Sequence, residues 1–159
     1  MNDTGRSRVY AAEAQVRALF DSADEHGVRT VHTHGSALEL PVERRFASVE
    51  SLQAYIDAAL ALNWVRAQWP RAATAVRVRA RRGQGGAHYE ARPPVIAVPL
   101  HAWALRELVV LHELAHHLVW GTDDGHGPVY VTCYTELVSE IVGPEAGFVL
   151  RTALHEAGA

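Results

Sequence analysis

The chain has 159 residues, of which 48% are hydrophobic and 21% are charged, and its formal net charge is −3. This composition is that of an ordinary globular protein, long enough to form one domain over residues 1–159 with a buried core. The slight acidity argues against general nucleic-acid binding, and the single cysteine excludes an intramolecular disulfide. No apolar run reaches the roughly 18 residues of a membrane span, and the chain opens without a basic and apolar leader. We therefore expect a cytoplasmic protein that does not enter the membrane.

Three elements are predicted in the first 70 residues. Apolar residues at helical spacing predict a helix over 6–21, ended by His26-Gly27. Alternation over 28–40, with His34-Gly35-Ser36 at its centre, predicts a β-hairpin. Ser48 is a good N-cap for a helix from 49 to about 68, which Trp69-Pro70 would break.

Three strands are predicted next, over 76–81, 88–91 and 95–99. Arginine alternates with apolar residues in the first of these, and we interpret the arginines as a solvated face because no aromatic residue is interleaved with them. We expect the third strand to lead almost directly into the following helix. If it lies at the edge of the sheet, it could pair with an extended peptide substrate along residues 95–98, namely Val95, Ile96, Ala97 and Val98.

The helix predicted over 102–119 carries the sequence His112-Glu113-Leu114-Ala115-His116 and contains neither glycine nor proline. Residues four apart lie one above the other on a helix, so His112 and His116 can converge on one metal ion. Glu113 would lie beside the metal, where a carboxylate can accept a proton from an attacking water. The helix is apolar nearly all round, which predicts burial, and a bound metal would satisfy its polar residues.

A catalytic zinc site usually has three protein ligands and one open position. Gly121 would end the helix and Thr122-Asp123-Asp124-Gly125 would turn the chain, so that His126, followed by Gly127-Pro128, points back as the third ligand. Glu136 is the alternative third ligand, on a helix predicted over 129–141. A last helix is predicted over 145–155, after Gly143-Pro144.

Two further residues are candidates for supporting roles. His117 lies four residues after Glu113 and could orient that carboxylate, or it could be part of the polar surface. Tyr130 lies four residues after His126 and could donate to an oxyanion or contact substrate, with simple packing as the alternative.

The H-E-x-x-H motif followed by G-H-G-P and an aromatic residue resembles the metalloprotease domains of the SprT-like and Spartan proteins. Over most of its length the chain also resembles a family of bacterial metallohydrolases of similar size, and the matching segments are 41–46, 62–66, 105–117 and 142–147. The resemblance implies His112, His116 and His126 as zinc ligands and Glu113 as the general base. The single cysteine rules out the zinc ribbon that SprT-like proteins often carry, which weighs against a DNA-linked role.

Together these observations predict an α+β, zincin-like domain, in which a small twisted sheet packs on a central metal-binding helix with further helices around it. We expect one Zn²⁺ per chain and hydrolysis of an amide bond, with a peptide or protein substrate. Two alternatives stay open: a hydrolase of a smaller amide, and a non-catalytic module that uses zinc as a staple and binds a partner or nucleic acid. Imidazole ligands also suit other transition metals, so the ligand set alone does not fix the ion.

Overall fold

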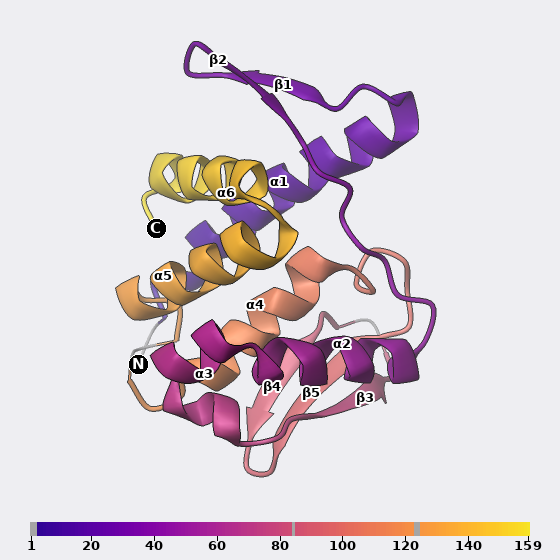
Figure 1. The fold of residues 1–159 in the computed structure, drawn as a ribbon, viewed down its shortest axis with the longest axis vertical. Helices are drawn as coiled ribbons and strands as arrows, with labels where there is room; N and C mark the ends of the chain where they lie inside the picture. The colour runs from indigo at the N-terminus through magenta and orange to yellow at the C-terminus, as the bar shows by residue number, and fades with distance from the viewer. Residues whose placement is uncertain (1–2, 84, 123–124) are drawn as a thin grey trace. The chain divides into compact units, whose positions relative to one another are not determined.

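The computed structural model describes residues 3–83, 85–122 and 125–159. These residues contain six α-helices and two small β-sheets, which is the α+β composition that the sequence predicts. They form two compact units (Figure 1): unit 1 takes in the described residues up to Glu43 and from Gly125 onward, and unit 2 is Arg44–Thr122. The zincin-like arrangement of the helices stays a prediction. Asp123 and Asp124, assigned to a turn from the sequence, lie outside the described residues.

Unit 1 is built on two long helices that pack against each other, α1 (Arg6–His26) and α6 (Pro144–Ala157). The buried residues of α1 recur at helical spacing, as expected, and the helix continues past Asp21 to the predicted stop at His26-Gly27. Gly27 stops it in the left-handed conformation, with φ of 68°. Between the two helices in sequence come α5 (Pro128–Leu137) and a short π-helix, η2 (Val138–Val142). The predicted break at Gly143-Pro144 is confirmed, since α6 begins at that proline.

The predicted hairpin of unit 1 is confirmed. Strands β1 (Thr30–Thr33) and β2 (Ser36–Glu39) pair antiparallel, with Thr33 opposite Ser36. His34 and Gly35 form the two-residue turn, and both have positive φ, 47° and 76°. This is the backbone geometry that a tight hairpin turn requires.

Unit 2 begins with three helical segments, α2 (Val49–Ala61), α3 (Asn63–Gln68) and the 3-10 helix η1 (Pro70–Ala73). Ser48 is the N-cap of α2 in a full capping box with Ser51, as expected from its side chain. The single helix predicted from 49 to about 68 is wrong in one respect, because Leu62 is extended (ψ 132°) and separates α2 from α3.

The sheet of unit 2 has the order β3-β5-β4, with β3 (Arg77–Arg81) parallel and β4 (His88–Ala91) antiparallel to β5 (Pro94–Pro99). The three strands agree with the sequence prediction, but the expected edge position of β5 is wrong. Val95, Ile96 and Ala97 have partners on both neighbouring strands. A substrate peptide therefore cannot pair with this strand along Val95–Val98 as we expected from the sequence.

The outer edge of β3 is occupied by a side chain. The Gln53 amide nitrogen donates to the carbonyl oxygen of Val76 (2.8 Å), and its oxygen accepts from the amide of Val78 (2.7 Å). Backbone groups of residues two apart in a strand point to the same side. Gln53 thus makes the two hydrogen bonds that a neighbouring strand would make there.

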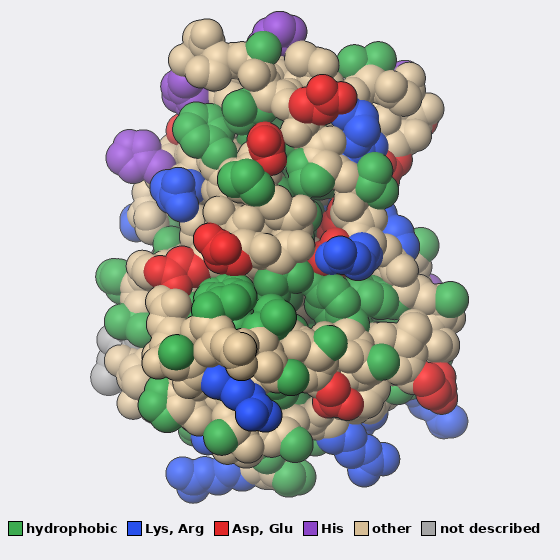
Figure 2. Space-filling view, viewed as in Figure 1, with side chains coloured by type: hydrophobic (Ala, Val, Ile, Leu, Met, Phe, Trp, Pro, Cys, Tyr) green, Lys and Arg blue, Asp and Glu red, His purple; other side chains and the backbone are tan. Residues whose placement is uncertain are grey.

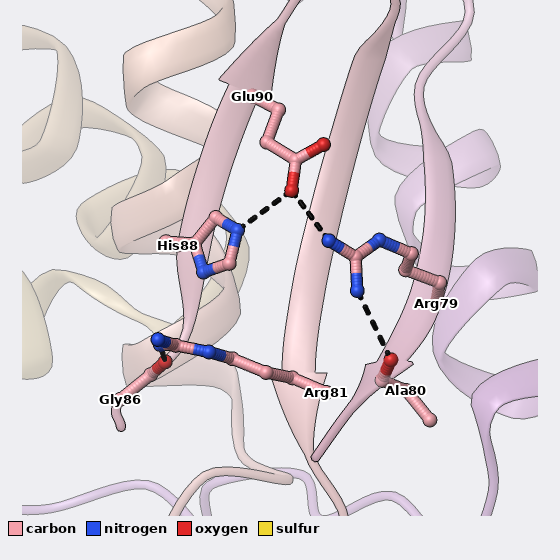
Figure 3. Close-up of polar contacts among 6 residues, drawn as sticks. All are labelled: Arg79, Ala80, Arg81, Gly86, His88 and Glu90. Carbon is pink, nitrogen blue, oxygen red and sulfur yellow. Dashed lines mark hydrogen bonds and ion pairs between the residues drawn. The ribbon is translucent and has the colours of Figure 1, made fainter. Parts of the chain in front are cut away.

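The two faces of this sheet differ in character. Tyr89 and Ile96 share the face on which α4 (Glu107–Leu118) packs. On the other face, Glu90 accepts a hydrogen bond from Arg79 across β5 (2.5 Å) and another from His88 on its own strand (2.8 Å; Figure 3). Since Arg79 and His88 both lie opposite Ala97, this polar group covers a small residue that is fully buried.

The arginines of β3 make internal contacts. Arg79 pairs with Glu90, and Arg81 donates to the carbonyl oxygen of Gly86 (Figure 3). Figure 2 shows basic side chains at the lower end of the view, where Figure 1 places the strands of unit 2. Arg77 is exposed, whereas Arg79 and Arg81 are half-buried. The interpretation of these arginines as a solvated face stays a prediction. Among the described residues, no helix combines the length and apolarity needed to cross a membrane.

Candidate metal centre

The helix that carries the H-E-x-x-H motif, α4, begins five residues later than the sequence predicts, at Glu107 instead of Ala102. Arg106, just before the helix, is extended and pairs antiparallel with Arg45 of the same unit. The amide of Phe46 donates to the carbonyl oxygen of Leu105 (3.0 Å), and the amide of Glu107 donates to the carbonyl oxygen of Arg44 (3.2 Å). These long-range bonds use backbone groups that a longer helix would need, so β5 does not lead directly into α4.

The first turn of α4 is fixed by a buried carboxylate. Glu107 is fully buried, and it accepts hydrogen bonds from the backbone amide of Arg44 (2.7 Å) and from the Tyr55 hydroxyl (2.5 Å). The Arg44 guanidinium lies 3.1 Å away and balances the charge. A carboxylate in the first helical turn also interacts favourably with the helix dipole.

The two motif histidines lie on one face of α4, as expected from their spacing. Their ring centroids are 5.1 Å apart, His112 is buried, and His116 is half-buried. Glu113 is 4% exposed, and its Oε1 lies 4.0 Å from Nε2 of His112. The carboxylate of Glu113 therefore lies close to the imidazole of His112.

His126 lies in the loop that leads into α5. Gly127 is the N-cap of that helix and Pro128 its first residue, which confirms the predicted start. The imidazole is 7% exposed, and it lies between the rings of Tyr130 and Tyr10, with centroid distances of 4.9 and 5.6 Å. Tyr130 itself is fully buried and packs edge-on against the imidazole, so it helps to define the pocket of the ring.

One partner of His126 was not predicted from the sequence. Oδ2 of Asp3 lies 2.6 Å from Nδ1 of His126, across 123 positions in the chain. Oδ1 of Asp3 also accepts from the backbone amide of Arg6 (3.0 Å) at the start of α1. Burial acts to raise the pKa of Asp3, but the hydrogen bond and charge of His126, with the Arg6 amide, hold that pKa below its usual value. An Asp three residues before a helix signals a cap, but no local signal points to its distant imidazole.

His112, His116 and His126 form a group that could hold a metal ion. Each offers one nitrogen, and these nitrogens all lie within 4.8 Å of one another. With zinc–nitrogen bonds of about 2.0–2.1 Å, the nitrogens of tetrahedral ligands lie roughly 3.4 Å apart. Three neutral imidazoles are a suitable donor set for zinc and for several other transition metals. The identity of the metal is not fixed by this geometry.

The alternative ligand Glu136 is not a member of this group of described residues. It lies in the last turn of α5 and is half-buried. His126 as the third ligand stays a prediction.

The prediction that His117 could orient Glu113 is not supported, and neither is a surface position. His117 is fully buried, and its Nε2 donates to the carbonyl oxygens of Arg71 and Thr74, both at 3.0 Å. Its Nδ1 accepts from the Tyr89 hydroxyl (2.9 Å). Burial lowers the pKa of His117, which agrees with a neutral ring. His117 thus joins α4 to η1 and β4 within unit 2.

Comparison with protein-family models, with curated proteins and with solved structures gave no match. The resemblance to SprT-like domains therefore rests on the motif residues themselves.

Proposed function

We propose that the protein is a zinc-dependent hydrolase of amide bonds that acts on peptides or proteins. The observation that carries the proposal is the group of three histidines, His112, His116 and His126, with Glu113 beside it. Three imidazoles leave one position of a tetrahedral metal open, which is the arrangement of catalytic rather than structural zinc sites. The resemblance to SprT-like metalloproteases supports a peptide or protein substrate.

The roles of the residues follow from their chemistry. The three histidines would hold the metal through neutral nitrogens. Zinc, when bound, would supply Lewis acidity, which lowers the pKa of a water to about 7 and polarises the carbonyl under attack. Glu113 accepts the proton of that water on its carboxylate and then delivers it to the leaving amine nitrogen. Because the burial of Glu113 excludes competing water, the proton stays with this carboxylate between the two steps.

A second candidate function, a structural zinc site that only stabilises the fold, is favoured by one observation. His112 and Glu113 are 1% and 4% exposed, which leaves little surface through which a substrate could reach them. A structural site would be closed by a fourth protein ligand in place of water.

Metal content tests the site itself. We would measure it by plasma mass spectrometry on the purified wild type, His126→Ala and Glu136→Ala after zinc is supplied and excess removed. The proposal requires about one zinc per chain in the wild type and in Glu136→Ala, and loss of zinc in His126→Ala. Wild-type protein without metal would overturn it, and so would a site that depends on Glu136.

Hydrolysis is tested with the zinc-loaded protein and a mixed peptide library in water enriched in ¹⁸O. New peptide termini should appear with one ¹⁸O in each new carboxylate, because water is the nucleophile. Glu113→Gln should keep the zinc and lose the cleavage, since an amide cannot accept the proton. Cleavage by Glu113→Gln at the wild-type rate would exclude the proposed base. A zinc-loaded wild type that cleaves no library peptide would favour the structural centre.

A further inference from the structure

We infer that Asp3 is the positioning residue for His126: it fixes the imidazole in the orientation and tautomer that present Nε2 to the metal. This inference rests on the metal site proposed above. It concerns a residue of unit 1 that the H-E-x-x-H and G-H-G-P motifs do not contain.

The contact between Asp3 and His126 is short and largely shielded from solvent. Oδ2 of Asp3 lies 2.6 Å from Nδ1 of His126, and the two side chains are 28% and 7% exposed. An ionised carboxylate can only accept, so Nδ1 carries the proton and Nε2 becomes the ligating nitrogen. In metal sites such a carboxylate orients the ring and strengthens it as a ligand.

Asp3 is itself held in place. Its Oδ1 accepts from the amide of Arg6 at 3.0 Å, which anchors the carboxylate to the N-terminal end of α1. One oxygen therefore binds the helix while the other binds the imidazole. The carboxylate has little freedom to swing away from His126, which is the property that a positioning residue needs.

Two glycines allow the turn at Asp3 and the loop at His126 to approach this closely. A Cβ at Gly125, where φ is +76°, would lie 2.5 Å from Oδ2 of Asp3. A Cβ at Gly5 would lie 2.5 Å from the carbonyl oxygen of His126. Figure 1 shows the N-terminal end of α1 beside the start of α5, where these segments meet. Gly125, next to His126, thus leaves room for Asp3, and Gly5, two residues after Asp3, leaves room for His126.

The chain offers a matched control for this pair. Glu156 lies 3.0 Å from Nε2 of His34, but both side chains are more than half exposed, at 54% and 57%. Removing that carboxylate changes the same type of contact and the same charge in the same unit. It does so without touching a residue of the metal group.

The test is the zinc dissociation constant, measured by competition with a chromophoric chelator for the wild type, Asp3→Ala, Asp3→Asn and Glu156→Gln. We expect Asp3→Ala to weaken zinc binding by about 10–100-fold. Asp3→Asn should lose less, because its amide oxygen can still accept from Nδ1 but carries no charge. Glu156→Gln should bind as the wild type does. The visible spectrum of the Co²⁺ form should change in Asp3→Ala and stay unchanged in Glu156→Gln.

The melting temperature of each metal-free variant separates positioning from stability. The side-chain oxygen of Asn can accept from the Arg6 amide as that of Asp does, so metal-free Asp3→Asn should melt close to the wild type while still binding zinc more weakly. Wild-type zinc affinity in both Asp3 variants, alongside loss of zinc in His126→Ala, would overturn the role of Asp3 and leave the metal site standing. Wild-type protein that binds no zinc would overturn both proposals.

Discussion

The hydroxyl oxygen of Tyr89 on β4 lies 2.9 Å from Nδ1 of His117 on α4. Arg71 completes the arrangement, because its guanidinium donates both to the Tyr89 hydroxyl (3.0 Å) and to the carbonyl oxygen of His117 (2.9 Å). Each polar group of this buried network therefore has a partner. The network fixes α4 against the sheet and η1 through hydrogen bonds as well as through apolar packing.

Replacing His117 with Ala should destabilise the protein by about 2–4 kcal/mol, since it removes a fully buried ring together with its hydrogen bonds to the carbonyl oxygens of Arg71 and Thr74 and to the Tyr89 hydroxyl. Tyr89→Phe removes the two hydrogen bonds of a half-buried hydroxyl and should cost only about 1–2 kcal/mol. Urea unfolding of metal-free protein measures both values. His101→Ala, at an exposed position, is the control and should fall within about 0.5 kcal/mol of the wild type. Equal effects for His117→Ala and His101→Ala would contradict a structural role for His117.

Gly125→Ala and Gly121→Ala form a second pair. Both glycines have positive φ, +76° and +83°, so either substitution should cost about 1–2 kcal/mol in backbone strain. Only at Gly125 does the added Cβ meet the Asp3 carboxylate; at Gly121 nothing lies within 4 Å. Gly125→Ala should therefore also weaken zinc binding, whereas Gly121→Ala should not. Chelator competition and urea unfolding on the same samples test this prediction. Equal zinc affinities in the two variants would show that the approach of Gly125 to the Asp3 carboxylate does not matter for the metal site.

The group around Glu90 predicts a pH dependence. Hydrogen bonds from His88 and then Arg79 hold the pKa of Glu90 below its usual value of 4.5. The ionised carboxylate therefore stabilises the native state above about pH 4.5, and this contribution is lost as the pH falls through the lower, native pKa. Glu90→Gln should be less stable than the wild type near pH 7 and equally stable in strong acid. A ¹³C NMR titration should show the pKa of Glu90 rising towards 4.5 in Arg79→Gln; an unchanged value would exclude that contact.

Cys133 should be chemically inert in the native protein. Burial raises the pKa of its thiol, and the charge of Glu136 raises it further, so the reactive thiolate is scarce. The side chain is 1% exposed. Iodoacetamide at neutral pH should label it slowly in native protein and rapidly in urea, with the mass of the intact chain as the measurement. Rapid native labelling would show that α5 opens locally.

The parts of the site that sequence could predict are those that local spacing controls. His112 and His116 are one helical turn apart, and Gly127-Pro128 begins a helix, so their placement needs no distant information. The true start of α4 depends on backbone hydrogen bonds to residues 44–46, and the periodicity of the sequence carries no information about such distant partners. Asp3 could not be predicted as a partner of His126, because nothing in the spacing of acidic residues identifies a contact between such distant positions.

In the sheet of unit 2, too, the local features could be predicted from the sequence and the long-range arrangement could not. The three strands could be predicted from alternation and from the prolines around β5. The order of the strands could not be predicted, because a short, apolar strand has the same sequence pattern at the centre of a sheet and at its edge. The burial of Val95, Ile96, Ala97 and Val98 agrees with the central position and explains their unbroken apolar character.

The Gln53 amide on the border of β3 has a consequence for how this protein behaves in a crowded solution. An open strand border is a template on which another chain can dock and begin to aggregate. Here α2 supplies a side chain in place of that missing neighbour, so the backbone groups of Val76 and Val78 are closed to another strand. Gln53 thus protects the start of this border, a task for which other proteins use a lysine, a proline or a bulge.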